Sequence, residues 1–186
     1  MLPRPTAAQL QAAVGATTPD IIAPDLRVLF CGINPSVYSA VVGHHFARPG
    51  NRFWKALHGS GFTPHQFTPE RDRDLLSLGY GITNVASPAT VAAADLAPEQ
   101  LAQGGRELRA RVLDYAPRWL AVLGVSAYRV AFAQPRAVMG LQPPSIGATR
   151  IWVLPNPSGL NAHFPPTELA RTYREFRVFM EADNDG

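Results

Sequence analysis

The sequence predicts a single α/β domain with a central, mostly parallel β-sheet and helices on both of its faces. Short apolar segments alternate along the 186-residue chain with segments whose apolar residues recur at helical spacing, which is typical of this class. The strand segments hold few polar residues, as expected of parallel strands that are buried on both faces. Apolar residues make up 46% of the chain, which is enough for a core and excludes disorder for most of it.

Four apolar segments are short enough to be strands and end at glycine or in a loop. They span residues 27–33, 80–85, 119–124 and 150–154. Six helices are expected around them, three of which begin at proline, a residue favoured in the first helical turn. They span residues 7–14, 51–57, 69–78, 98–115, 126–132 and 165–180. The segment 34–49 is expected to be a long loop.

The chain is expected to have one folded domain with short extensions. Residues 1–24 are predicted to be a partly ordered lead-in, residues 25–182 the domain, and residues 183–186 a frayed acidic tail. No apolar run approaches the roughly 20 residues that span a bilayer, and the N-terminal residues lack the pattern of a secretory signal. We therefore expect a soluble, cytoplasmic protein with no membrane partner.

The ionisable residues are compatible with a polyanionic partner and do not indicate a metal site. Of the 17 basic residues 16 are Arg and one is Lys55, and the formal net charge is +3. The single cysteine, Cys31, excludes an intramolecular disulfide and a four-cysteine cluster. The adjacent pair His44 and His45 has no partner cluster and is expected to face solvent or phosphate. We therefore expect no metal and no other cofactor.

Ligands of open α/β sheets bind outside the carboxyl ends of the strands, so the connections that follow the strands are the candidate functional loops. These are residues 34–49, 86–97, 124–126 and 155–165. Two of them begin with the same tripeptide, Asn-Pro-Ser, at 34–36 and 156–158. An Asn amide can orient a water molecule or grip a base edge, and Pro rigidifies the turn. Two ordinary Asn-Pro turns are the alternative.

Three segments together carry a resemblance to a known family. Gly32-Ile33-Asn34-Pro35-Ser36, the run from Phe46 to Trp54, and Asn156-Pro157-Ser158-Gly159-Leu160 resemble the mismatch-specific uracil-DNA glycosylases, the family of Mug and thymine-DNA glycosylase. The resemblance extends in one colinear order from residue 26 to about residue 180. It implies a uracil-DNA glycosylase fold for the domain. It also implies a monofunctional enzyme of base excision repair.

The implied enzyme flips uracil, and other modified or mismatched pyrimidines, out of DNA and hydrolyses the N-glycosidic bond, leaving an abasic site. Its partner would be DNA that contains such a base, bound by a monomer in the nucleoid. Two other functions remain open. The chain could be a catalytically silent module that probes DNA lesions, or a hydrolase of free nucleosides or nucleotides.

The resemblance also assigns site residues. Asn34 would position the attacking water, since an amide is too weak a base to deprotonate it. The base-binding pocket would contain Ile33, Ser39, Phe46 and Asn156, with the Phe46 ring stacked on the flipped base. A Phe46 that belongs to the core is the alternative.

The loop that fills the gap left by the flipped base would contain Ser158, Gly159, Leu160 and Asn161. Leu160 would be the apolar wedge, and its alternative role is a hydrophobic contact with the helix that follows. Here the sequence departs from the Mug pattern, because Ala162 stands where an Arg is expected, two residues beyond the wedge. We therefore expect a weaker preference for uracil opposite guanine.

One carboxylate, Asp95, lies in the candidate loops. It could act as the general base that Asn34 cannot be. It could instead cap the helix that begins near Pro98. The sequence leaves both roles open.

Overall fold

Strand β1 (Val28–Gly32) lies between two parallel neighbours and organises the sheet of this computed structural model, which describes residues 2–183. The strand order is β2-β1-β3-β5-β4, with β2 at Tyr80–Asn84, β3 at Trp119–Leu123 and β5 at Thr149–Leu154. Strands β2, β1, β3 and β5 are parallel, and β4 (Gly140–Ile146) is an antiparallel edge strand. Apart from Asp183, the tail expected at 183–186 lies outside the described residues.

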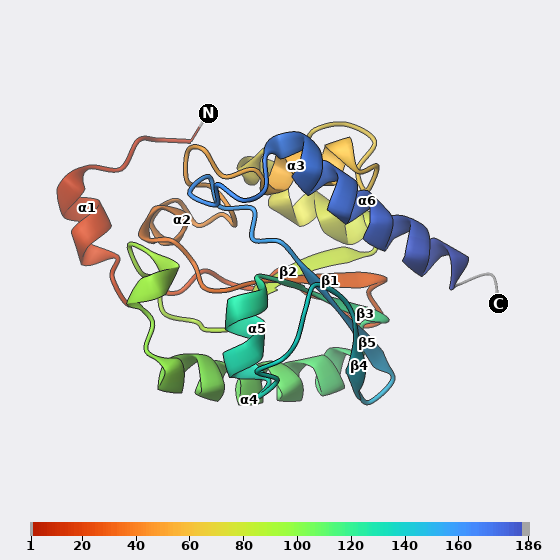
Figure 1. Cartoon of the computed structure of the whole chain (residues 1–186). Helices are drawn as coiled ribbons and strands as arrows, with labels where there is room; N and C mark the ends of the chain where they lie inside the picture. The colour runs from red at the N-terminus through yellow and green to blue at the C-terminus, as the bar shows by residue number, and fades with distance from the viewer. Residues whose placement is uncertain (1, 184–186) are drawn as a thin grey trace.

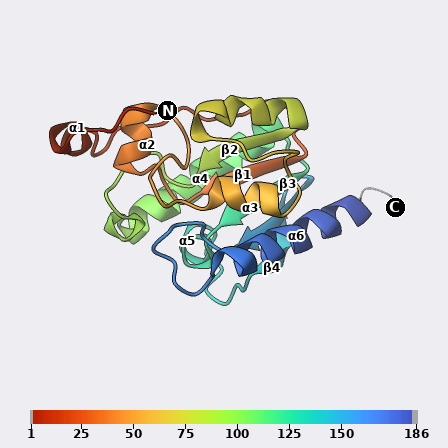
Figure 2. The ribbon, with the colours of Figure 1, turned by 90° about the horizontal axis from the view of Figure 1, so that it is seen from above.

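Helices cover both faces of the sheet, which confirms the predicted fold class (Figures 1 and 2). Helices α3 (Phe53–Gly59) and α6 (Pro166–Ala182), with the 3₁₀ segment η1 (Pro69–Leu78), lie on one face. Helices α4 (Pro98–Tyr115) and α5 (Val125–Ala131) lie on the other. No helix in residues 2–183 is long and apolar enough to cross a membrane.

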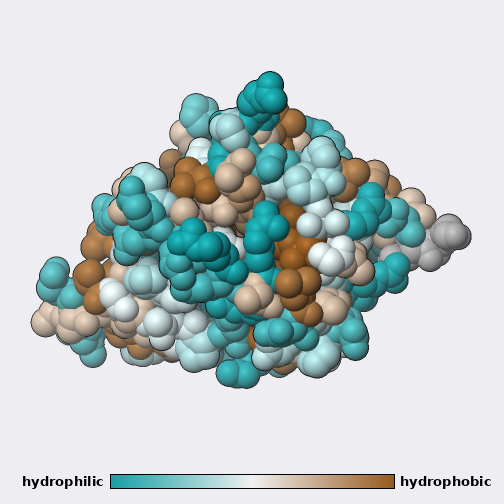
Figure 3. Space-filling view, turned by 90° about the horizontal axis from the view of Figure 1, so that it is seen from below, coloured by the Kyte–Doolittle hydropathy of each residue, from teal (hydrophilic) through white to brown (hydrophobic). Residues whose placement is uncertain are grey.

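The alternation of side chains along β1 supplies a core to each face. Val28 and Phe30 belong to the cluster under α3 and α6, whereas Leu29 and Cys31 belong to the cluster under α4 and α5. All four side chains are fully buried. Seen from the α4 side, the surface mixes hydrophilic and hydrophobic residues (Figure 3). The predicted strands are therefore buried on both faces because each face has its own helical layer.

Three elements escaped prediction, the shortest of which is the 3₁₀ turn η2 (Ala93–Asp95). Helix α2 (Val37–Val42) lies inside the expected long loop, and its signals are local: Ser36 caps the first turn and Gly43 ends the helix at φ 74°. Strand β4 contains Pro143 and Pro144, which a sequence reading excludes from a sheet interior. It is an edge strand with a register shift between Leu141 and Ser145, where proline is tolerated. Short helix α1 (Ala7–Ala12) completes the fold.

The residues before β1 are tied to the sheet. Ile21 exchanges both backbone hydrogen bonds with Ile82, at 2.9 and 2.8 Å, along the outer edge of β2. Arg111 of α4 forms an ion pair with Asp20 at 3.0 Å and donates a hydrogen bond to Thr83. This segment therefore belongs to the packing of the domain.

Helix α4 approaches its neighbours through two glycines. A Cβ on Gly105 would lie 2.0 Å from the Ala131 carbonyl oxygen, and one on Gly104 would lie 2.2 Å from that of Val85. Both neighbours are backbone atoms, so a side chain at either position forces the helix away from α5 or from the connection that follows β2. That connection leads into one of the candidate functional loops.

Gly105→Ala is expected to destabilise the protein although alanine favours helices. Overpacking costs about 1–3 kcal/mol, which exceeds the gain in helix propensity of at most about 1 kcal/mol. Thermal unfolding should show a lower Tm than the wild type. The control is Gln103→Ala, at an exposed position of the same helix. Equal or higher stability for Gly105→Ala would show that α4 is not held at this close distance.

Candidate active site

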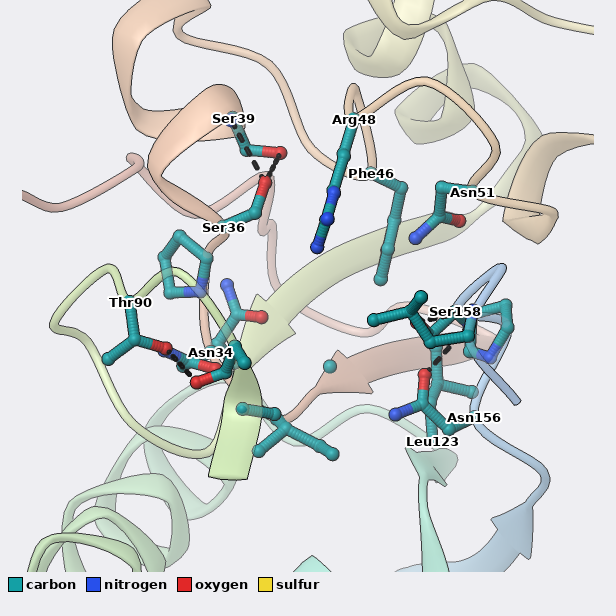
Figure 4. Close-up of a pocket in the computed structure, with 18 of the residues that line it drawn as sticks. Asn34, Ser36, Ser39, Phe46, Arg48, Asn51, Thr90, Leu123, Asn156 and Ser158 are labelled. Atoms are coloured by element: carbon teal, nitrogen blue, oxygen red, sulfur yellow. Dashed lines mark hydrogen bonds between the residues drawn. The ribbon is translucent and has the colours of Figure 1, made fainter. Parts of the chain in front are cut away.

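A cavity of about 370 Å³ opens where β1, β2 and β3 end. The last residues of these strands, Gly32, Asn84 and Leu123, line it. The labelled side chains that surround it in Figure 4 include Asn34, Phe46, Arg48, Thr90, Asn156 and Ser158. The cavity therefore lies at the carboxyl edge of the sheet, where the sequence predicts the functional loops. The connection 124–126 does not contribute to it.

Most of the predicted site residues line this single cavity. They are Ile33, Asn34, Ser39, Phe46, Asn156, Ser158, Leu160 and Asn161. Gly159 instead lines an adjoining hollow of about 270 Å³ between residues 48–51 and 158–160. Asp95 lines neither.

Gly32 forms part of the cavity floor because it has no side chain. A Cβ there would lie 2.5 Å from Asn84 Oδ1 and 3.3 Å from Cζ of the Phe46 ring. The aromatic ring and the amide therefore occupy space that a side chain at this position would need.

Hydrogen bonds fix the Asn34 side-chain amide through its nitrogen and leave its oxygen available. Its Nδ2 donates hydrogen bonds to the Pro88 carbonyl and to Thr90 Oγ1, both at 2.8 Å. The Thr90 hydroxyl donates in turn to the Ala92 carbonyl at 2.7 Å, so it can only accept from Asn34. Both amide hydrogens of Asn34 are therefore used. The group of Asn34 that can still bind a ligand in the cavity is its carbonyl oxygen, which can accept a hydrogen bond from water.

Ser36 and Ser39 join the first loop to the cavity wall. Ser36 Oγ donates to Ser39 Oγ at 3.1 Å, and Ser39 Oγ also accepts the Ala47 backbone N–H at 3.2 Å. Ser39 is 2% exposed. This buried hydroxyl thus fixes the start of α2 against the backbone that follows Phe46.

Phe46 packs against the core and also lines the cavity. Its ring stacks on Phe53 at a centroid distance of 4.0 Å and an interplanar angle of 28°, and it packs against the core. It is half-buried and also lines the cavity. Its backbone has φ 52°, a left-handed conformation that is strained for a bulky residue.

Hydrogen bonds on both sides hold this strained turn. The His45 N–H donates to Asp72 Oδ2 at 3.1 Å, and the Trp54 indole donates to the His45 carbonyl at 3.3 Å. On the other side, Ala47 is bound to Ser39. The ring of Phe46 therefore projects over the cavity from a fixed backbone.

His45 is not the solvated or phosphate-facing residue that the sequence suggested. It is 2% exposed, and its Nε2 lies 2.8 Å from the Pro19 carbonyl oxygen. A carbonyl oxygen can only accept a hydrogen bond, so Nε2 must carry the hydrogen. Burial lowers the pKa of His45 below its usual value, so the ring is held neutral. Neighbouring His44 lies 3.2 Å from the buried Asp72 carboxylate.

Asn156 lines the cavity on the side opposite Asn34 and can offer it hydrogen-bond donors (Figure 4). Its Oδ1 accepts the Ser158 N–H at 2.9 Å, and this bond fixes which end of the amide is nitrogen. No hydrogen bond joins its Nδ2 to another group in residues 2–183, so this nitrogen can donate toward a ligand. Beyond it, Leu160 is 74% exposed at the rim, so its side chain is not buried against α6. An apolar side chain held in solvent beside a cavity is compatible with the predicted wedge.

Two arginines that sequence analysis missed lie beside these loops. Arg48 is exposed and lines both hollows, and no carboxylate in residues 2–183 pairs with it. Arg52 lies beneath residues 158–164 and donates to their carbonyls. The only indication in the sequence was that both arginines lie close to Phe46 along the chain. Closeness along the chain does not reveal what a side chain contacts.

Asp95 holds a loop that lines the cavity. It is exposed, and its Oδ2 accepts the Ala92 N–H at 2.8 Å, within the short turn η2. It does not cap α4, whose N-cap residue is Ala97. Residues 92–94 line the cavity, so Asp95 contributes to the site at least through their position.

Groups that would support covalent or metal chemistry lie elsewhere. Lys55 is exposed on α3 and does not line the cavity. Cys31 is fully buried, and burial raises the pKa of its thiol far above the usual value. Within residues 2–183, no three His, Cys, Asp or Glu residues are placed to hold a metal ion.

Thr90→Val is expected to free the Asn34 amide while keeping the shape of the side chain. The amide would retain only the Pro88 carbonyl as an acceptor, and its side-chain NH₂ signals should exchange faster with water by NMR. The protein should lose about 1–3 kcal/mol of stability, because the Thr90 hydroxyl makes two hydrogen bonds and each contributes about 0.5–1.5 kcal/mol. Thr172→Val is the control, since its hydroxyl bonds within α6. Unchanged Asn34 signals would refute this role of Thr90.

Comparisons with known proteins agree with this architecture. A family model described as the uracil DNA glycosylase superfamily matches residues 19–177. A solved structure, the solution NMR structure of a "putative Uracil DNA glycosylase" from Methanosarcina acetivorans, is similar with a TM-score of 0.56 and 17% sequence identity. The match covers 88% of this chain and 99% of that one. At this identity, the structural likeness establishes the shared fold alone.

Proposed function

We propose that this chain, which belongs to the uracil DNA glycosylase superfamily, is a monofunctional glycosylase of the mismatch-specific kind. It flips uracil, and other modified or mismatched pyrimidines, out of DNA and hydrolyses the N-glycosidic bond, leaving an abasic site. The observation that carries the proposal is the fixed Asn34 amide, whose carbonyl oxygen is the group left to bind water in a cavity that also holds an aromatic platform.

The Asn34 carbonyl oxygen orients water for the reaction. It accepts a hydrogen bond from the water and so aims the water oxygen at C1′ of the deoxyribose. The new bond forms between that oxygen and C1′ as the bond from C1′ to N1 of uracil breaks. The bonding pair leaves with uracil, and the water proton passes to solvent or to the departing base. Asn34 remains a neutral amide throughout.

The rest of the cavity binds the base and the charge that develops on it. Stacking on an aromatic ring such as Phe46 is worth about 1–3 kcal/mol per base. The Asn156 Nδ2 donors are suited to a uracil carbonyl, which becomes more negative as the bond breaks. Donors that strengthen with this charge lower the barrier more than they tighten substrate binding.

Two further features support hydrolysis on DNA. A bifunctional glycosylase attacks with an amine, and the single lysine of the chain does not line the cavity. The exposed Leu160 suits a duplex, which offers a base stack to fill, and so does Arg48, which pairs with no carboxylate among residues 2–183 and could meet a phosphate. A hydrolase of free nucleosides would need neither group.

Excision of uracil from an end-labelled oligonucleotide tests the function. After treatment with hot alkali, the wild type should break the strand at uracil, whereas Asn34→Ala should be slower by about 100-fold or more, the scale of a lost positioning contact. Because Ala162 replaces an Arg, uracil opposite A or in a single strand should be cut at rates comparable to uracil opposite G. A preference for guanine of several orders of magnitude would refute that part.

The same experiment separates the other candidate functions. Binding of the uracil duplex without breakage would identify a silent lesion-probing module. Release of uracil from free deoxyuridine, without action on DNA, would identify a nucleoside hydrolase.

Asp95→Asn distinguishes a general base from a residue that holds the loop. Asn retains an oxygen that can accept the Ala92 N–H but cannot take a proton from water. The exposed position outside the cavity lining favours the structural role, so single-turnover excision should stay near the wild-type rate, with Asp95→Ala slower. A loss of about 10²- to 10⁴-fold in Asp95→Asn, at unchanged Tm, would instead make Asp95 the base.

A further inference from the structure

The loop that carries Leu160 is bound to the body of the protein mainly through one side chain. Nη1 of Arg52 donates to the Phe164 carbonyl at 2.6 Å, and Nη2 donates to the carbonyls of Ser158 at 2.5 Å and Asn161 at 2.9 Å. The Arg52 backbone N–H also donates to the Pro157 carbonyl at 3.0 Å. These four bonds reach both ends of the loop and its middle.

We propose that Arg52 is the positioning residue for the wedge: it holds residues 158–164 in one shape, so that Leu160 is already in place before DNA arrives. This inference rests on the proposed base-flipping function. Its effect is specific to duplex substrates, because a wedge is needed only where a base must be displaced from a stack.

The chemistry of Arg52 suits this role. Within residues 2–183 no carboxylate forms an ion pair with it, so backbone carbonyls alone bind its charge. Its guanidinium is planar, and its two terminal nitrogens reach three carbonyls at once. A lysine ammonium is a compact charge that cannot reproduce this fork.

The opposite side of the loop is closed by backbone. A Cβ on Gly159 would lie 2.6 Å from the Gly50 carbonyl oxygen, so residues 50 and 159 are in close contact. The loop is thus held between the 48–51 segment and the Arg52 side chain that follows it. The arginine that the Mug pattern places within the loop itself, absent here at Ala162, is not needed for this support.

Arg52 also joins the wedge to the base platform. It directly precedes Phe53, on which the ring of Phe46 stacks at 4.0 Å. One short stretch of chain therefore supports both the side chain that would fill the stack and the side chain that would receive the base. Because the loop is already ordered when the protein has folded, DNA binding does not bear the entropy cost of ordering it.

The test compares excision of uracil from duplex and single-stranded oligonucleotides by Arg52→Gln and Arg52→Lys. We expect the duplex rate to fall by about 100-fold, the scale of a misplaced group, with the single-strand rate within a few-fold of the wild type. Arg129→Gln is the matched control, because Arg129 also donates from a partly buried site to a loop carbonyl, that of Ala137 at 2.8 Å. It should change neither rate.

A double mutant tests whether Arg52 acts through Leu160. In a Leu160→Ala background, Arg52→Gln should cause little further loss on duplex DNA, since the group that it positions is gone. Equal losses on duplex and single strands, or full additivity with Leu160→Ala, would overturn the inference. If Arg52→Gln does not fold, Arg52→Lys provides the same comparison.

Hydrogen exchange gives a readout that is independent of activity. Backbone amides of residues 158–164 should exchange faster in Arg52→Gln than in the wild type, with those of β1 and β3 unchanged. Unchanged exchange in the loop would refute the positioning role. A wild-type protein that shows no uracil excision would refute the proposed function, whereas the exchange experiment would still decide whether Arg52 holds the loop.

Discussion

The site depends on the absence of a side chain at the end of β1. Gly32 leaves room for the Phe46 ring, which comes from the connection after β1, and for the amide of Asn84, the last residue of β2. A methyl group there would force the Asn84 side chain to shift, because its carbon would lie 2.5 Å from Asn84 Oδ1. The two Asn-Pro-Ser loops line the cavity together with Gly32. The size of the cavity therefore depends on how closely the surrounding residues approach the end of β1.

The backbone at Phe46 is strained, and hydrogen bonds to the residues beside it keep it in that conformation. Phe46 adopts a left-handed backbone conformation that costs on the order of 1–3 kcal/mol. The buried groups around it, Asp72, Ser39 and the Trp54 indole, bind the residues before and after it and offset this cost. In the proposed function, a ring held in this way needs little reordering to receive a base.

Much of the fold and part of the site could be predicted from the sequence because strand order and strand ends follow simple rules. Parallel strands end at one edge, so Asn34 and Asn156 were expected near each other, and both line one cavity. Helix α2 was missed because six residues give no periodicity, and β4 because its prolines argue against a strand.

The contacts that orient the site residues could not be predicted. Thr90 holds Asn34 across 56 positions of sequence, and Arg52 holds Asn161 across 109. Nothing local in either segment indicates such a partner. The burial of His45 likewise follows from Pro19 and Asp72, which come from two distant segments.

The two edges of the sheet bear on how the molecule behaves in a crowded solution. An exposed edge strand is a template on which another chain can add a strand, and such addition leads to aggregates. Here Ile21 occupies hydrogen-bonding groups on the outer side of β2. At the other edge, Pro143 and Pro144 remove two donors from β4, and the register shift interrupts its ladder. Growth of the sheet by strand addition is therefore disfavoured at both of its edges.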